Sequence, residues 1–222
     1  MYIMIIAAFA LSLWAQFRVK GTFKKWTKVE TSSGLTGYQA ARRMLDHNGL
    51  YDVPIEPIPG TLTDHYDPIH RVVRLSEPVY YESTISAVSV ACHEVGHAIQ
   101  HSVKYPFLVA RHRIFPVVNI ASGIAPFLLI AGILMQQFSL LGLGIVLFSA
   151  AVAFQLITLP VEFNASNRAR ALMLSQGFVT QDEERGVAKV LNAAALTYVA
   201  AALLSLLELI RYILMFTQSR EE

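Results

Sequence analysis

The chain has 222 residues and a net charge of only +2, with 54% hydrophobic and 15% charged residues. Soluble domains are roughly 45 to 50% apolar and about 25% charged, so the composition argues against a fully soluble protein and against a disordered one. The small net charge gives no indication of nucleic-acid binding. A single cysteine, Cys92, excludes an internal disulfide and any metal cluster built from cysteine alone. A metal site in this chain must therefore use His, Glu or Asp.

Four apolar runs predict four membrane-spanning helices, at residues 2–17, 115–135, 138–159 and 190–216. The last three are long enough to cross about 30 Å of hydrocarbon, and the first is near the short limit. Because positive charges follow the first run instead of preceding it, an uncleaved anchor is expected there. The second and third runs are separated only by two glutamines, which predicts a tight antiparallel hairpin. The alternative is a single hairpin with peripheral helices.

Charges beside the runs predict the topology. Basic residues follow the first run directly: Arg18, Lys20, Lys24, Lys25 and Lys28. The positive-inside rule then places the chain in the cytoplasm after this run. Four crossings would leave both termini outside and the segments 29–114 and 160–189 on the cytoplasmic side. Within the last run, Glu208 and Arg211 are three residues apart on a helix and are expected to pair.

The segment 29–114 has mixed polarity and carries helix and turn signals. Thr36 is the expected N-cap of a helix from Gly37 to His47, and Asn48 followed by Gly49 is the expected stop.

Two short β-type stretches follow, Val53 to Ile58 and Arg71 to Leu75, with several prolines in and between them. Prolines argue for edge strands and loops instead of a central strand. A helix from about Ser83 to Val103 comes next.

That helix contains the sequence His93-Glu94-Val95-Gly96-His97, which is the HExxH pattern. Residues four apart share one helical face, so His93 and His97 are able to bind a single Zn2+ ion. Glu94 lies beside them and is the candidate general base. The pattern alone is informative but not decisive, and the other interpretation is a buried polar patch on a core helix.

A catalytic zinc site normally takes three protein ligands. His101 is the nearest candidate in sequence, but on an unbroken helix it lies about 12 Å along the axis from His93. Glu162 is the stronger candidate, because it follows the third apolar run on the side that the topology assigns to the HExxH motif. A helix that starts near Pro160 would place Glu162 in its first turn, where Ser166 would brace it. An ordinary interfacial carboxylate is the alternative reading of Glu162.

Together these residues resemble the bacterial membrane-bound neutral zinc metallopeptidase family. The motifs of this family are of the same type as those of the heat-shock membrane proteases and the prenyl-protein CAAX proteases. The similarity covers nearly the whole chain and includes GYQAARRMLDHNGL from Gly37, GTLTDHYDP from Gly60, VRLSEPVY from Val73, ACHEVGHAIQH from Ala91, FQLITLPVEFNAS from Phe154 and NAAALTYVAAAL from Asn192. The HEVGHAIQH and LPVEF strings are its most specific parts.

The resemblance implies a mainly α fold: multi-pass membrane helices with a gluzincin-like zinc metalloprotease lobe that carries a small β element, as a single domain over residues 1–222. It implies a membrane endopeptidase with His93, His97 and Glu162 as zinc ligands and Glu94 as catalytic base. The expected partners are the lipid bilayer and membrane-associated protein or peptide substrates. Family members often have Asp where this chain has Asn164, which puts a charged role at that position in doubt.

In the expected mechanism Glu94 takes a proton from the attacking water and passes it to the leaving amine. A second oxyanion donor is needed besides the metal, and His65, Tyr66 and Arg168 are the candidates. Val72 to Leu75 is a candidate edge strand for an extended substrate, with simple sheet packing as the alternative.

Two other functions are alternatives to a peptidase at the membrane surface. An intramembrane protease of the site-2 type needs an aspartate motif within a membrane helix, and none of the four runs contains Asp. A non-hydrolytic zinc-binding scaffold or transporter remains the alternative, supported by Glu208 and Arg211 in the last run, since charges within the membrane often mark a pathway.

Overall fold

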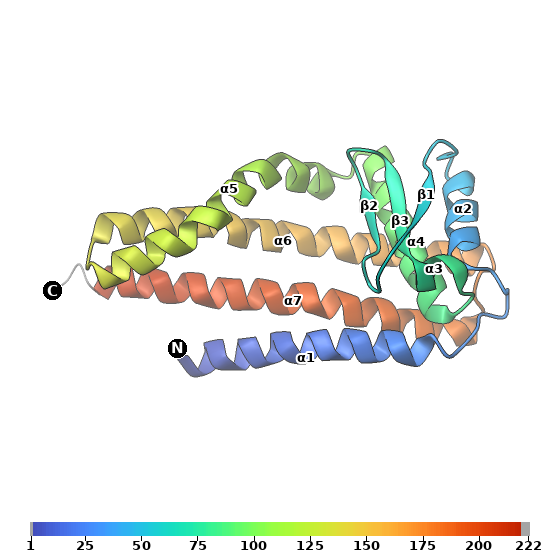
Figure 1. The fold of residues 1–222 in the computed structure, drawn as a ribbon, viewed down its shortest axis with the longest axis horizontal. Coiled ribbons are helices and arrows are strands. Elements are labelled where there is room, and N and C mark those ends of the chain that lie inside the picture. The colour runs from blue at the N-terminus through green and yellow to red at the C-terminus, as the bar shows by residue number, and fades with distance from the viewer. Residues whose placement is uncertain (1, 219–222) are drawn as a thin grey trace. The chain divides into compact units, whose positions relative to one another are not determined.

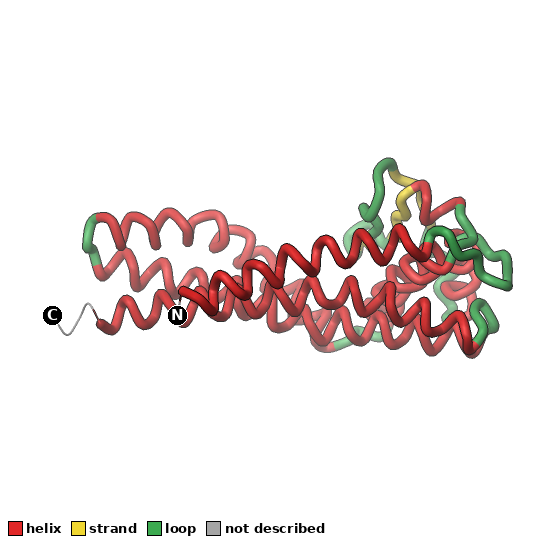
Figure 2. Tube along the Cα trace, turned by 90° about the horizontal axis from the view of Figure 1, so that it is seen from below, coloured by secondary structure: helices red, strands yellow, loops and turns green. Residues whose placement is uncertain are grey.

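The computed structural model describes residues 2–218 and is mainly helical (Figures 1 and 2). The helices are α1 (Tyr2–Trp26), α2 (Gly37–His47), α3 (Glu77–Tyr81), α4 (Ile85–Ser102), α5 (Pro106–Leu134), α6 (Phe138–Ser175) and α7 (Gln181–Gln218). The strands are β1 (Ile55–Ile58), β2 (His65–Asp67) and β3 (Val72–Ser76). The predicted fold class, a mainly α protein with a small β element, is confirmed.

Helices α1, α5, α6 and α7 are long and apolar enough to cross a membrane. They contain the four predicted apolar runs, apart from Met135, which lies just after the end of α5. Helices α1 and α6 continue beyond their apolar runs into polar sequence, whereas α5 and α7 begin several residues before theirs. The predicted runs were therefore correct in number and place, but each is only part of a longer helix.

The described residues divide into two compact units. The helical unit consists of α1 up to Ala15, Pro106–Pro160, and α7 from Thr197 onward. The mixed unit consists of Gln16–Tyr105 and Val161–Leu196, and it contains the sheet and α4.

Within the helical unit, α5 and α6 form the tight hairpin that the sequence predicts. Gln136 turns the chain with a φ of 52°. Gly132 and Gly144 let the two helices approach closely: a Cβ at Gly132 would lie 2.5 Å from the Leu141 nitrogen, and one at Gly144 would lie 2.9 Å from Leu129. Small residues at such a crossing favour helix packing in membranes.

The charged pair in α7 is also present. Glu208 Oε2 lies 2.5 Å from an Arg211 guanidinium nitrogen, and both side chains are about three-quarters buried. The predicted pairing is confirmed, and it gives each of the two charges in the apolar run 190–216 a local partner.

In the mixed unit, α2 begins and ends as expected. The Thr36 hydroxyl accepts from the Gln39 backbone N–H, and the Gln39 side chain accepts from the Thr36 N–H, which completes a capping box. The helix ends at His47, and Gly49 then adopts a φ of 72°, a left-handed conformation that suits glycine.

The sheet has the strand order β1-β3-β2, with β1 parallel and β2 antiparallel to β3. The expectation that Val72 to Leu75 forms an edge strand is wrong, because β3 is central and both of its edges are paired. Pro57 lies in β1, which is an edge strand, as expected for a strand that contains proline. No proline lies within β3, so the argument from proline does not apply to that strand. The short strand β2 was not predicted.

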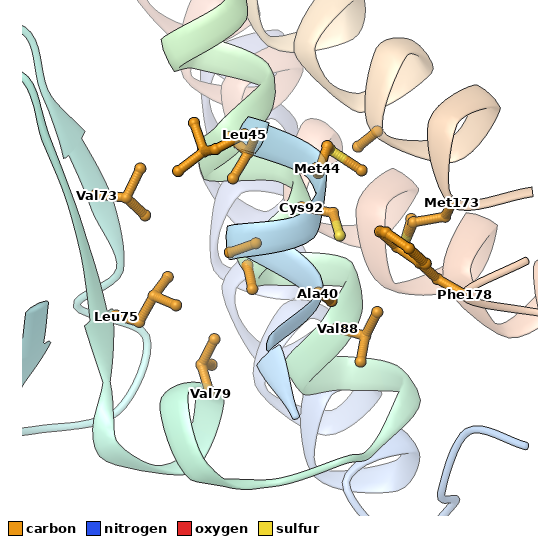
Figure 3. Close-up of a cluster of buried hydrophobic side chains, with 14 of the residues drawn as sticks. Ala40, Met44, Leu45, Val73, Leu75, Val79, Val88, Cys92, Met173 and Phe178 are labelled. Carbon is orange, nitrogen blue, oxygen red and sulfur yellow. The ribbon is translucent and has the colours of Figure 1, made fainter. Parts of the chain in front are cut away.

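The core of the mixed unit lies between α2, α4, β3 and the last turns of α6. Figure 3 shows its labelled side chains: Ala40, Met44, Leu45, Val73, Leu75, Val79, Val88, Cys92, Met173 and Phe178. Helix α4 begins at Ile85, after the N-cap Thr84, whose side chain accepts from the Ala87 N–H. One face of α4 is buried in this core, which fixes the rotation of the helix about its axis.

A second face of α4 packs against α6 at Gly96. A Cβ on Gly96 would lie only 2.7 Å from the Ala165 carbonyl oxygen and 3.2 Å from the Ala165 Cα. Real Cβ atoms do not approach backbone so closely, so the two helices can meet at this distance only because residue 96 has no side chain.

We therefore expect Gly96→Ala to destabilise the protein, by about 1–3 kcal/mol if it behaves as an overpacked core substitution. Thermal unfolding of the purified protein in detergent measures the loss. Gly21→Ala is the matched control, since a Cβ there meets nothing within 4 Å and alanine favours helix formation. Equal unfolding midpoints for Gly96→Ala and wild type would contradict the close contact.

Candidate metal centre

Two histidines of α4 lie on the same helical face, one turn apart. The His93 and His97 rings have centroids 4.8 Å apart and meet edge to face, with an interplanar angle of 85°. Both side chains are nearly buried, with exposures of 14% and 11%. This arrangement directs both imidazoles into one small volume, as the spacing of four residues predicts.

Glu162 of α6 enters the same volume. Its Oε2 lies 3.3 Å from His93 Nε2 and 3.6 Å from His97 Nε2. One ligand atom from each of the three residues falls within 4.8 Å of the others, so the group could hold a metal ion. Glu162 is only 3% exposed, so its carboxylate is buried beside the two imidazoles.

The secondary structure around Glu162 differs from the expected one. No helix starts at Pro160, because α6 runs without a break from Phe138 to Ser175 and has Pro160 inside it. Proline removes one backbone hydrogen bond, but helices with apolar surroundings tolerate this. Glu162 thus lies in the middle of a long helix, which holds it more rigidly than a first turn would.

Ser166 also differs from expectation. Its Oγ lies 3.1 Å from His93 Nδ1, so it supports that histidine and not Glu162. On the other side of the centre, Gln100 Oε1 lies 3.0 Å from His97 Nδ1. Each imidazole therefore has a partner on Nδ1, and the Nε2 atoms are the ones that face Glu162.

This pattern of partners fits a cation. Gln100 Oε1 can only accept, so the His97 Nδ1 must carry the proton of that hydrogen bond. In the neutral ring, His97 Nε2 then presents a lone pair toward the Glu162 carboxylate. With the ring neutral, a metal cation between these two atoms would be held by both of them. Two imidazole nitrogens and a carboxylate oxygen form a ligand set that zinc uses in hydrolytic sites.

Glu94 is adjacent to His93 on α4 and is 8% exposed. A second carboxyl group, that of Asp64, lies near it. Burial raises the pKa of Asp64, hydrogen bonds from Ser76 oppose this, and the negative charge of Glu94 adds to the increase. The neighbourhood of Glu94 therefore contains a second carboxyl group, which the HExxH motif alone does not indicate.

The other candidate ligands and oxyanion donors from the sequence have hydrogen-bond partners of their own. His101 Nδ1 lies 2.8 Å from the Tyr66 hydroxyl, and His65 Nδ1 lies 2.8 Å from the Thr63 carbonyl oxygen. Arg168 Nε donates to Asn164 Oδ1 at 2.8 Å. In the part of the chain that the structure describes, neither His101 nor His65 belongs to the three-residue ligand group.

Sequence reasoning missed Gln100. Its side chain is fully buried, and it connects α4 to α6 by donating to the Val161 carbonyl oxygen at 2.8 Å and to Asn164 Oδ1 at 3.0 Å. Its place three residues after His97, on the same helical face, was the signal that could have found it.

These features define a membrane protein with a buried centre of two histidines and one glutamate on adjoining helices. The sequence agrees with that class, because residues 1–217 match the family described as "Putative neutral zinc metallopeptidase". The chain belongs to this family, and zinc is its metal. It is also 66% identical over 217 residues to "Putative membrane protease YugP" of Bacillus subtilis (strain 168), which covers 98% of this chain and 96% of that protein. No solved structure matches the chain.

Proposed function

We propose that the protein is a zinc-dependent membrane endopeptidase whose active site faces the cytoplasm. The observation that carries the proposal is the convergence of His93, His97 and Glu162, with Glu94 on the same helix as the two histidines. Membership of a zinc metallopeptidase family supports peptide-bond hydrolysis. The four apolar helices support a membrane location.

In this proposal His93 and His97 bind zinc through Nε2, and Glu162 binds it through a carboxylate oxygen. The bound ion would act as a Lewis acid that lowers the pKa of water and polarises the substrate carbonyl. Ser166 and Gln100 would hold the two rings in the required orientation by their contacts with the Nδ1 atoms. Such outer partners keep the ligand nitrogen directed at the metal.

Glu94 would serve as general base and then as general acid. It would accept a proton from the attacking water and deliver it to the amine nitrogen as the peptide bond breaks. Its burial favours this role, because a carboxylate removed from bulk water exchanges protons with the reacting groups in preference to solvent.

The substrates would be proteins or peptides at or near the membrane, since the ligand Glu162 follows the end of an apolar run by only three residues. The basic residues after the first run support a cytoplasmic site by the positive-inside rule. A non-hydrolytic zinc scaffold or transporter would use the same ligands, but it would have no need of Glu94.

Glu94→Gln keeps the shape of the side chain and removes its ability to take a proton. We expect cleavage of a casein or membrane-protein substrate to fall by about 10²–10⁴-fold, the usual contribution of a general base, with zinc content unchanged. Glu82→Gln, an exposed carboxylate outside the centre, is the matched control and is expected to cleave normally. Equal cleavage by Glu94→Gln and wild type would refute the peptidase proposal and favour the scaffold.

Glu162→Ala tests the third ligand. We expect the purified wild type to hold one zinc ion per chain and Glu162→Ala to lose most of it, because two imidazoles alone leave the coordination incomplete. Elemental analysis after dialysis against a weak chelator measures the content. His93→Ala is the positive control for ligand loss, and full zinc retention by Glu162→Ala would remove Glu162 from the ligand set.

Reporter fusions test the side of the membrane. A fusion after Lys28 is expected to report the cytoplasm, and one after Gln136, in the hairpin turn, is expected to report the outside. The two positions control for each other, since a correct topology requires opposite signals. An external signal after Lys28 would place the zinc centre in the other compartment.

A further inference from the structure

We propose that Gln100, Asn164 and Arg168, called here the Gln100 network, position His97 for metal binding and tie its orientation to the helix that supplies Glu162. This inference rests on the proposed zinc site and deepens it. In this proposal each of the three residues acts through His97, so each is a positioning residue.

The first contact of the network fixes which nitrogen of His97 faces the centre. Gln100 Oε1 lies 3.0 Å from His97 Nδ1, and the Gln100 side chain is fully buried. Because the amide oxygen can only accept, the contact holds a proton on Nδ1, so in the neutral ring Nε2 is the nitrogen whose lone pair is available to a metal. The orientation of the Gln100 amide therefore decides the tautomer of His97.

The orientation of the Gln100 amide is itself fixed by two acceptors. Its Nε2 donates to the Val161 carbonyl oxygen at 2.8 Å and to Asn164 Oδ1 at 3.0 Å. Rotating the amide by 180° would set its oxygen against both of these acceptor oxygens. Both contacts would be lost at once, so one orientation is strongly favoured in this buried site.

Arg168 holds the last member of the network. Its Nε donates to the same Asn164 Oδ1 at 2.8 Å, one turn further along α6. The shared oxygen accepts from both Gln100 and Arg168, which requires the Asn164 amide to present its oxygen and not its nitrogen. The Arg168 guanidinium thus fixes the orientation of the Asn164 amide, and Asn164 fixes that of the Gln100 amide. Gln100 in turn fixes the tautomer of His97.

The network has a consequence for the geometry of the centre. Val161, Asn164 and Arg168 all belong to α6, the helix that carries Glu162. Helix α6 would therefore provide one ligand directly and orient a second through Gln100, so the two cannot shift independently. His93 is supported separately, by Ser166.

The test measures metal affinity in the full-length protein in detergent, by competition for zinc with a chromophoric chelator. Asn164→Leu removes the shared oxygen with little change in size, and we expect zinc to bind about 10- to 100-fold more weakly, as when other outer partners of metal ligands are lost. Asn164→Asp keeps an acceptor oxygen and is expected to restore near wild-type affinity. Ser175→Ala, an exposed α6 hydroxyl that bonds only its own helix, is the matched control.

Two further readouts separate positioning from a general loss of stability. The cobalt(II)-substituted protein is expected to show a shifted visible spectrum in Asn164→Leu, although residue 164 is not a ligand. The double variant Gln100→Leu with Asn164→Leu should bind little more weakly than the worse single variant, because both act through His97. Gln100→Leu with Ser166→Ala should show the product of the two single effects, because they act on different histidines.

Wild-type zinc affinity and cobalt spectrum in Asn164→Leu would overturn the network while leaving the peptidase proposal intact. If Asn164→Leu does not fold, Arg168→Met at the half-buried end of the network takes its place, with the same expectation and the same contrary result. Equal zinc binding by the wild type and Glu162→Ala would instead refute the proposed zinc site itself. The two failures are therefore distinguishable.

Discussion

The close approach of α4 and α6 at Gly96 is the constraint on which the rest of the centre depends. With no side chain at residue 96, the Ala165 carbonyl oxygen lies only 2.7 Å from the position that a Cβ would take. One turn of α6 away from that contact, Glu162 then comes within 3.3 Å and 3.6 Å of the two histidine nitrogens. A larger residue would move the carboxylate away from the histidines. Metal coordination tolerates errors of only a few tenths of an ångström, so the glycine inside HEVGH is part of the site's geometry.

Both helices at this contact are held by structure outside the centre. The core that includes Val88, Cys92 and Met44 fixes the rotation of α4 about its axis. Helix α6 is one continuous helix, and its first part is a candidate membrane span. Glu162 can therefore be buried as a carboxylate without depending on a loop. Rigid elements on both sides place the three side chains more accurately than loops do, and this would suit the proposed zinc site, which needs room for water and substrate.

Local sequence signals predicted most of the fold. The four apolar runs, the N-cap at Thr36 and the start of α4 depend on composition or on residues a few positions apart, and the structure agrees with them. Errors arose where distant segments decide. Pro160 was expected to start a helix, but the continuing apolar and helical context of α6 outweighs one missing hydrogen bond. β3 was expected at an edge, but the unforeseen strand β2 pairs with its open side.

The sequence by itself determined the chemistry available: a chain rich in membrane helices, two histidines and a glutamate at helical spacing, and a second glutamate after an apolar run. These follow from residue type and local periodicity, which are present in any one segment. Only the tertiary structure decided that Glu162 meets the histidines from the middle of a helix, that Ser166 supports His93, and that Gln100 connects His97 to α6. Those contacts join residues more than 60 positions apart in the sequence. Tertiary packing brings such residues together, and a local sequence pattern does not predict it.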